Sequence, residues 1–147
     1  MFKKLNKKGF TLAELLIVVA IIGVLVAISI PIFTSQLEKA REATDLANIR
    51  SAYAECSAAL LTGGGDEIQM TTDKKTAYKQ IKLNQTVKDW QTDKATEVAG
   101  KTLTAIGFTP TGSGSETVYV SVNESTGIAV GTSAPSGSTT PTTPSGE

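Results

Sequence analysis

Residues 8–33 have the sequence KGFTLAELLIVVAIIGVLVAISIPIF, which contains the longest apolar run of the chain. From Phe10 to Phe33 it is apolar, and its interruptions are Thr11, Glu14, Gly23 and Ser29. As an α-helix rising about 1.5 Å per residue, it is long enough for a hydrocarbon core about 30 Å thick. The stretch therefore predicts a single membrane-spanning helix.

The charges before this helix predict its orientation. The lysines at positions 3, 4, 7 and 8 all precede the apolar run. Basic residues favour the cytoplasmic side, so we expect a cytoplasmic N-terminus and an extracellular C-terminal body. The whole chain has 14 basic and 14 acidic residues. Without these four lysines, 10 basic residues remain, so the formal net charge is −4.

Two ordinary interpretations of this segment are open. In a secretory signal peptide, Ala27-Ile28-Ser29 would be the cleavage site and Ile30 the mature N-terminus. The other interpretation is an uncut signal anchor. The glycine, the phenylalanine and the early glutamate at positions 9, 10 and 14 fit neither well, since a carboxylate near the centre of a membrane helix costs about 2.5–3.5 kcal/mol.

The run from Lys8 to Leu25 resembles the N-terminal signature of type IV pilins and related pseudopilins. The resemblance implies that a prepilin peptidase cuts after Gly9 and that the new N-terminal Phe10 is methylated on its amine. Glu14 then becomes the fifth residue of the mature chain, where the family has an assembly glutamate. Pro31 falls where the family has a helix-kinking proline.

The same resemblance implies how subunits join. Glu14 of one subunit meets the terminal amine of its neighbour, and a wrong stagger leaves two charges unpaired in a low-dielectric bundle. Gly23 and Pro31 weaken the helix between them. The family implies that this stretch extends in the fibre, and a simple membrane-helix kink is the alternative.

Beyond residue 33 the helical pattern continues. Apolar residues at spacings of three and four form one stripe, made of Leu46, Ile49, Tyr53, Cys56 and Leu60. The triglycine at 63–65 predicts the end, so we expect one helix over about 10–62. On its surface Arg41 can pair with Glu38 and with Asp45. We expect Cys56 in the core, with an intermolecular disulfide as the alternative.

The C-terminal half predicts a small sheet. Thr117 to Val122 alternates as a half-buried strand, residues 123–127 predict a turn, and 128–130 predict the returning strand. We expect a short helix within 73–87, capped by Asp73, with Trp90 packing this region on the long helix. Residues 101–106 predict a short helix or strand.

The predicted fold class is therefore α+β: a long N-terminal helix packed on a small antiparallel sheet of two to four strands, as in type IV pilins. Four regions are expected along the chain. They are a leader over 1–9, a transmembrane and fibre-core helix over 10–33, an extracellular headgroup over 34–131, and a disordered Ser/Thr/Pro tail over 132–147. Residues 112–115 predict a flexible loop.

Composition argues against catalysis. The 147 residues include no histidine and one cysteine, and no group of ligands has metal-binding spacing. We therefore expect no enzyme, no metal and no cofactor. The sequence has no basic patch of the kind that would predict nucleic-acid binding.

The predicted function is a structural subunit of a type IV pilus used for motility, adhesion or aggregation. Expected partners are copies of this chain, other pilins, the prepilin peptidase and methyltransferase, the assembly platform, and membrane lipid before assembly.

Two alternatives remain. One is a pseudopilin, either of a competence system, where DNA would be the cargo, or of type II secretion. Type II pseudopilins carry a calcium loop rich in Trp, Gly and Pro, but Asp89-Trp90 lacks the following glycine and proline. The other alternative is an ordinary anchored or secreted domain. The C-terminal half also lacks the cysteine pair of many Gram-negative pilins.

Overall fold

The computed structural model describes residues 9–65 and 67–138. The chain divides into two compact units between Leu37 and Glu38. Helix α1, Leu12–Thr62, contributes residues to both units, and the strands all lie in the second.

The first unit is an apolar helix with every described residue exposed. From Gly9 to Leu37 no side chain is buried by the rest of the chain. α1 is long and apolar enough to cross a membrane, judged by its length and composition. It begins at Leu12 and not at the expected Phe10, because Thr11 occupies the N-cap position.

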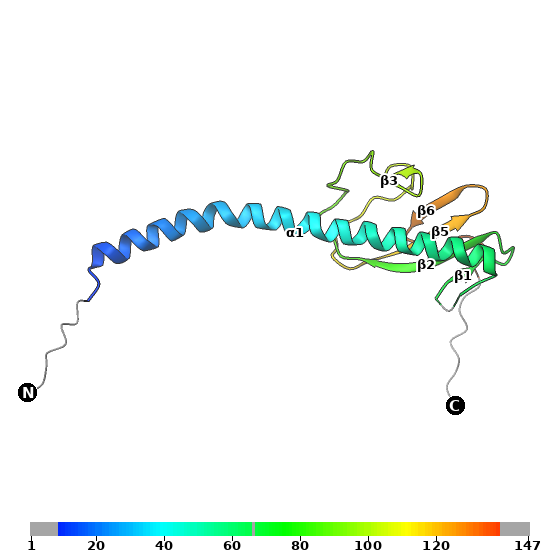
Figure 1. Ribbon diagram of the computed structural model, residues 1–147, viewed down its shortest axis with the longest axis horizontal. Helices are drawn as coiled ribbons and strands as arrows, with labels where there is room; N and C mark the ends of the chain where they lie inside the picture. Colours follow the sequence, from blue (N-terminus) through cyan, green and yellow to red (C-terminus); the bar gives the residue numbers. More distant parts are fainter. Residues whose placement is uncertain (1–8, 66, 139–147) are drawn as a thin grey trace, which may run out of the picture. The chain divides into compact units, whose positions relative to one another are not determined.

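The second unit places a four-stranded antiparallel sheet beside the later part of α1 (Figure 1). Its order is β1-β2-β5-β6, and the strands are β1 Gln69–Met70, β2 Thr76–Leu83, β5 Glu116–Asn123 and β6 Gly127–Gly131. A separate two-stranded sheet pairs β3, Glu97–Val98, with β4, Lys101–Thr102. The predicted helix-on-sheet fold is confirmed.

The core forms where the apolar stripe of α1 meets the sheet. Leu46 and Ile49 pack with Val118 and Val120 of β5, and a second cluster joins Cys56 to Val122. Every one of these side chains is less than 10% exposed. The predicted stripe and the predicted core position of Cys56 are confirmed, since these residues face the same side of the helix as the sheet.

Helix α1 ends where its glycines allow a left-handed backbone. Gly63 and Gly64 have φ of 89° and 134°, and their amides donate to the carbonyl of Ala59 at 2.8 and 3.0 Å. The predicted end at Thr62 is confirmed. The predicted hairpin is confirmed as well, because Asn123 pairs with Gly127 at the turn between β5 and β6.

The helix expected within residues 73–87 is wrong, because this region forms β2. Eight consecutive residues of β2 pair with β5, from Thr76 opposite Asn123 to Leu83 opposite Glu116. Asp73 caps a turn instead, accepting from the amide of Lys75 at 3.1 Å. Pairing with a distant strand has overridden a weak helical pattern.

Residues 101–106, expected to form a short helix or a strand, form a short strand followed by a turn. Lys101 and Thr102 form β4, and residues 103–107 then turn back, so that Leu103 and Ile106 are buried in the main core. The predicted strand is confirmed for its first two residues.

Two segments that were expected to be flexible or disordered form specific backbone hydrogen bonds. In the expected flexible loop, the amide of Gly114 donates to the carbonyl of Gln85 at 3.0 Å. The expected disordered tail is wrong at its start: Thr72 donates to the carbonyl of Gly137 at 2.9 Å, and Ser138 forms a β-bridge with Thr71. Residues 139–147 of that tail lie outside the described residues.

Candidate processing and assembly site

Thr11 and Glu14 form a reciprocal cap at the start of α1. The backbone amide and hydroxyl of Thr11 donate to Oε2 of Glu14 at 2.7 and 2.8 Å. The amide of Glu14 lies 3.2 Å from the hydroxyl oxygen of Thr11 and donates to it. This is a capping box, in which the side chains of the N-cap and N3 residues each satisfy the other's free amide.

The cap keeps the predicted cleavage position outside the helix. Gly9 and Phe10 precede the first helical residue, and Phe10 is 88% exposed. A Cβ added to Gly9 would meet no atom within 4 Å. The fold of the described chain therefore does not itself require glycine at this position.

Glu14 has polar partners within its own chain. Its carboxylate accepts both donors of Thr11, which lie in the same helical turn. An acidic group in the first turn also interacts favourably with the helix dipole. Glu14 is exposed in the single chain.

Gly23 and Pro31, the predicted flexible positions, both lie within the continuous α1. A Cβ on Gly23 would meet nothing within 4 Å, so no packing requires glycine there. Around Pro31, the hydroxyls of Ser29 and Thr34 donate to the carbonyls of Leu25 and Pro31 at 2.6 and 3.0 Å. Neither bond reaches the carbonyl of Ala27, which is the one that Pro31 leaves without its helical donor.

Thr11 is the site residue that sequence reasoning missed. The signal was present, because Thr11-Leu12-Ala13-Glu14 has the Thr-x-x-Glu spacing of a capping box directly before an apolar run. The resemblance implies a role for the charge of Glu14 but none for its hydrogen bond to Thr11.

Comparisons with known proteins point to the same segment. The family described as "Prokaryotic N-terminal methylation motif" matches residues 4–30. The chain is 49% identical over 53 residues to the type IV narrow pilus major component PilA5 of Thermus thermophilus. It is 53% identical over 36 residues to fimbrial protein EcpB of Eikenella corrodens, and 39% identical over 57 residues to fimbrial protein Q of Moraxella bovis.

These matches cover only part of each protein. They take in 34%, 24% and 39% of this chain, and 46%, 23% and 36% of the respective relatives. The chain therefore matches less than half the length of each relative. The search of solved structures returned no match. The predicted resemblance to type IV pilins is confirmed.

Proposed function

We propose that this chain, a type IV pilin by its N-terminal motif and its helix-on-sheet fold, is a structural subunit of a type IV pilus. The observation that carries the proposal is the first unit of the structure. A capped helix exposes apolar side chains on all sides from Leu12 to Leu37, and none of the described residues 9–65 and 67–138 buries them. Such a surface needs lipid first and other apolar helices afterwards.

Maturation begins at the exposed junction before the cap. A prepilin peptidase cuts between Gly9 and Phe10, and the freed amine of Phe10 is methylated. Cleavage removes the lysine-rich leader that holds the N-terminus at the cytoplasmic face. The mature subunit spans the membrane with residues 10–33, holds its headgroup from residue 34 onward outside, and leaves the membrane at the assembly platform to join the extracellular filament.

Glu14 gains a second partner during assembly. In the single chain its carboxylate accepts hydrogen bonds from Thr11. In the filament it also meets the positive terminal amine of a neighbouring subunit. Burial of either charge alone among apolar helices is heavily penalised, so the pair selects one axial stagger. Gly23 and Pro31 let the helix between them extend within the fibre.

Three variants separate the charge of Glu14 from its capping role. Glu14→Gln keeps an N3 side chain that can complete a capping box but removes the charge. Thr11→Val removes the hydroxyl of the cap but keeps the charge. Glu14→Ala removes both functions of the carboxylate.

The assay is electron microscopy of surface filaments from cells that carry the whole assembly system, with mass spectrometry of the mature N-terminus. We expect all three variants to begin at methylated Phe10, Thr11→Val to form filaments, and both Glu14 variants to form few or none. Normal filaments from Glu14→Gln would refute the charge pairing. A wild-type N-terminus other than Phe10 would refute the processing site, and Gly9→Leu should abolish cleavage.

A further inference from the structure

Three carboxylates on one face of α1 hold a loop of the headgroup. They belong to Glu38, Glu42 and Asp45, which follow one another at spacings of four and three residues. These residues are 6%, 0% and 0% exposed. Buried charges of one sign on one helix face repel one another, so their presence requires donors from elsewhere.

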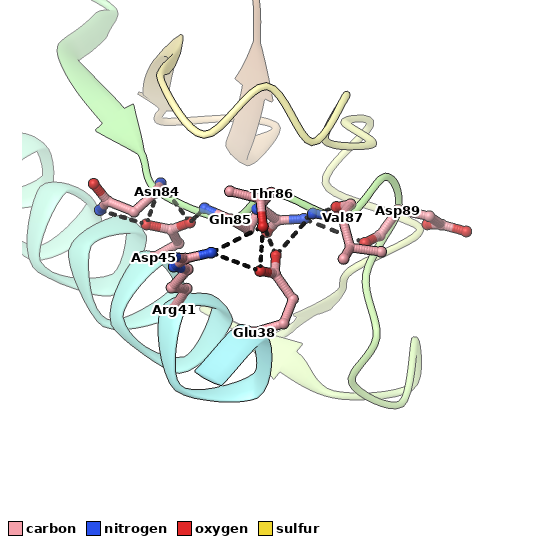
Figure 2. A network of polar contacts seen from close by, with 8 residues as sticks. All are labelled: Glu38, Arg41, Asp45, Asn84, Gln85, Thr86, Val87 and Asp89. Carbon is pink, nitrogen blue, oxygen red and sulfur yellow. Dashed lines mark hydrogen bonds and ion pairs between the residues drawn. The ribbon is translucent and has the colours of Figure 1, made fainter. Parts of the chain in front are cut away.

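The donors are six backbone amides of residues 84–92. Asp45 accepts from the amides of Asn84 and Gln85, each at 2.8–2.9 Å. Glu38 accepts from the amides of Thr86 and Val87 (Figure 2).

Glu42 completes the set, accepting from the amides of Gln91 and Thr92 at 2.9 and 2.8 Å. Residues 84–92 form no helix or strand, so these amides have no ladder partners and the carboxylates satisfy them. We call the three carboxylates the carboxylate latch.

The charges around the latch neutralise it only in part. From α1, Arg41 contacts Glu38 at 3.3 Å, as predicted, but no ion pair forms between Arg41 and Asp45. Within residues 84–92 the charged side chains are Lys88 and Asp89, and Asp89 pairs with Lys94 at 2.6 Å.

From residues 108–116, the charged side chain is Glu116, which accepts from the amide of Thr111. In the described part of the chain, therefore, no cationic side chain forms an ion pair with Glu42 or Asp45. Nor is any group of three or more His, Cys, Asp or Glu side chains among the described residues placed to hold a metal ion.

The opposite side of the loop is held by fewer bonds. The indole of Trp90 donates to the carbonyl of Phe108 at 3.1 Å, and the amide of Asp89 donates to the carbonyl of Pro110 at 3.0 Å. Gln85 is buried, and its Oε1 has no partner within the described chain. The latch thus supplies most of the hydrogen bonds between residues 84–92 and the rest of the headgroup.

We propose that the carboxylate latch is an acid-opened device that releases residues 84–92 from α1 while the four-stranded sheet stays paired. A protonated carboxyl loses the charge that strengthens its bonds, and its hydroxyl oxygen becomes a donor that accepts from an amide more weakly than a carboxylate oxygen does. The ladders of β2, β5 and β6 are backbone–backbone bonds, which do not titrate in acid, and the acidic side chain of these strands is Glu116 at the first residue of β5.

The pH range follows from Glu38. Burial raises the pKa of its carboxyl, but hydrogen bonds from Thr86, Val87 and Arg41 together outweigh burial and hold the pKa below its ordinary value of 4.5. A lowered pKa in the folded state gives stability that is present above the ordinary value and is lost as the pH falls through the folded value. The bonds that Glu38 accepts are therefore lost at a pH below 4.5, and the loop is released from this end of the latch first.

The test uses the full processed chain in detergent micelles, because Trp90 is its single tryptophan and lies in the latched loop. Acrylamide quenching of Trp90 and hydrogen exchange by mass spectrometry are followed from pH 7 to 3, corrected for the intrinsic pH dependence of exchange. We expect quenching to rise at least twofold and protection of the 84–92 amides to fall at least tenfold, while the β5 amides remain protected. A single transition in which both regions lose protection together would overturn the proposal.

Glu42→Gln imitates protonation at the centre of the latch. We expect it to show raised quenching of Trp90 already at pH 7. The matched control is Glu55→Gln, which removes a carboxylate of the same helix that pairs with Lys79 outside the latch. An unchanged pH profile in Glu42→Gln, or an equal shift in Glu55→Gln, would overturn the proposal. If Glu42→Gln does not fold, the wild-type titration still decides.

Discussion

Replacing Gly112 by alanine should destabilise the headgroup more than the same change at Gly107. The two glycines have nearly the same left-handed backbone, with φ of 78° and 83°. Their surroundings differ. A Cβ on Gly112 would lie 2.5 Å from the amide nitrogen of Lys88 and 2.6 Å from the carbonyl carbon of Val87, whereas a Cβ on Gly107 would meet nothing within 4 Å.

The magnitude follows from these two contributions. An L-residue in the left-handed region costs about 1–2 kcal/mol, and a less flexible unfolded chain offsets roughly 0.4–1 kcal/mol of that. Gly107→Ala should therefore cost about 1 kcal/mol. Gly112→Ala adds the overlap with a backbone that cannot rotate away, and such overpacking costs about 1–3 kcal/mol more.

Urea unfolding of the full chain in detergent, followed by the fluorescence of Trp90, measures both changes. Trp90 lies in the main core, so its emission reports unfolding of the headgroup. We expect Gly112→Ala to lose about 2 kcal/mol more than Gly107→Ala, with unchanged m-values. Equal losses would refute the reasoning, since the close approach of residues 87 and 88 would then carry no energetic weight.

Two further predictions concern the core that α1 forms with the sheet. Ile49 is 0% exposed, so Ile49→Ala should lower the free energy of unfolding by about 2–5 kcal/mol in the same urea assay. The control is Leu61→Ala, at a residue that is 89% exposed, which should change this free energy by less than about 0.5 kcal/mol. Burial raises the pKa of the Cys56 thiol to about 11, so at pH 8 iodoacetamide should label it at least tenfold more slowly in the folded chain than in urea, as measured by mass spectrometry. Rapid labelling of the folded chain would show that the thiol is accessible.

Sequence reasoning succeeded where the deciding interactions are local. The apolar run, the helical stripe ending at a triglycine, and the alternation of residues 117–122 each depend on neighbours a few positions apart. The junction around Gly9, Phe10 and Glu14 is a contiguous motif and could be identified by resemblance. Even the cap at Thr11, which was missed, could have been predicted from its spacing of three residues to Glu14.

It failed where partners come from far along the chain. Residues 76–83 form a strand because they pair with residues 116–123, a contact that no local pattern specifies. Arg41 and Asp45 have an ideal spacing for an ion pair, yet Asp45 binds amides 39 and 40 positions away. Backbone amides are present at every residue, so the sequence does not indicate which of them will need an acceptor.

Hydrophobicity and charge over one continuous segment were enough to identify the N-terminal part of the chain, in which lysines and the Gly9-Phe10 junction precede a long apolar helix. How residues 84–92 are held against α1 became visible only in the folded chain. This loop is held by buried carboxylates of α1, because unpaired amides brought close by folding are stabilised by the nearest acceptors, wherever those lie in the chain.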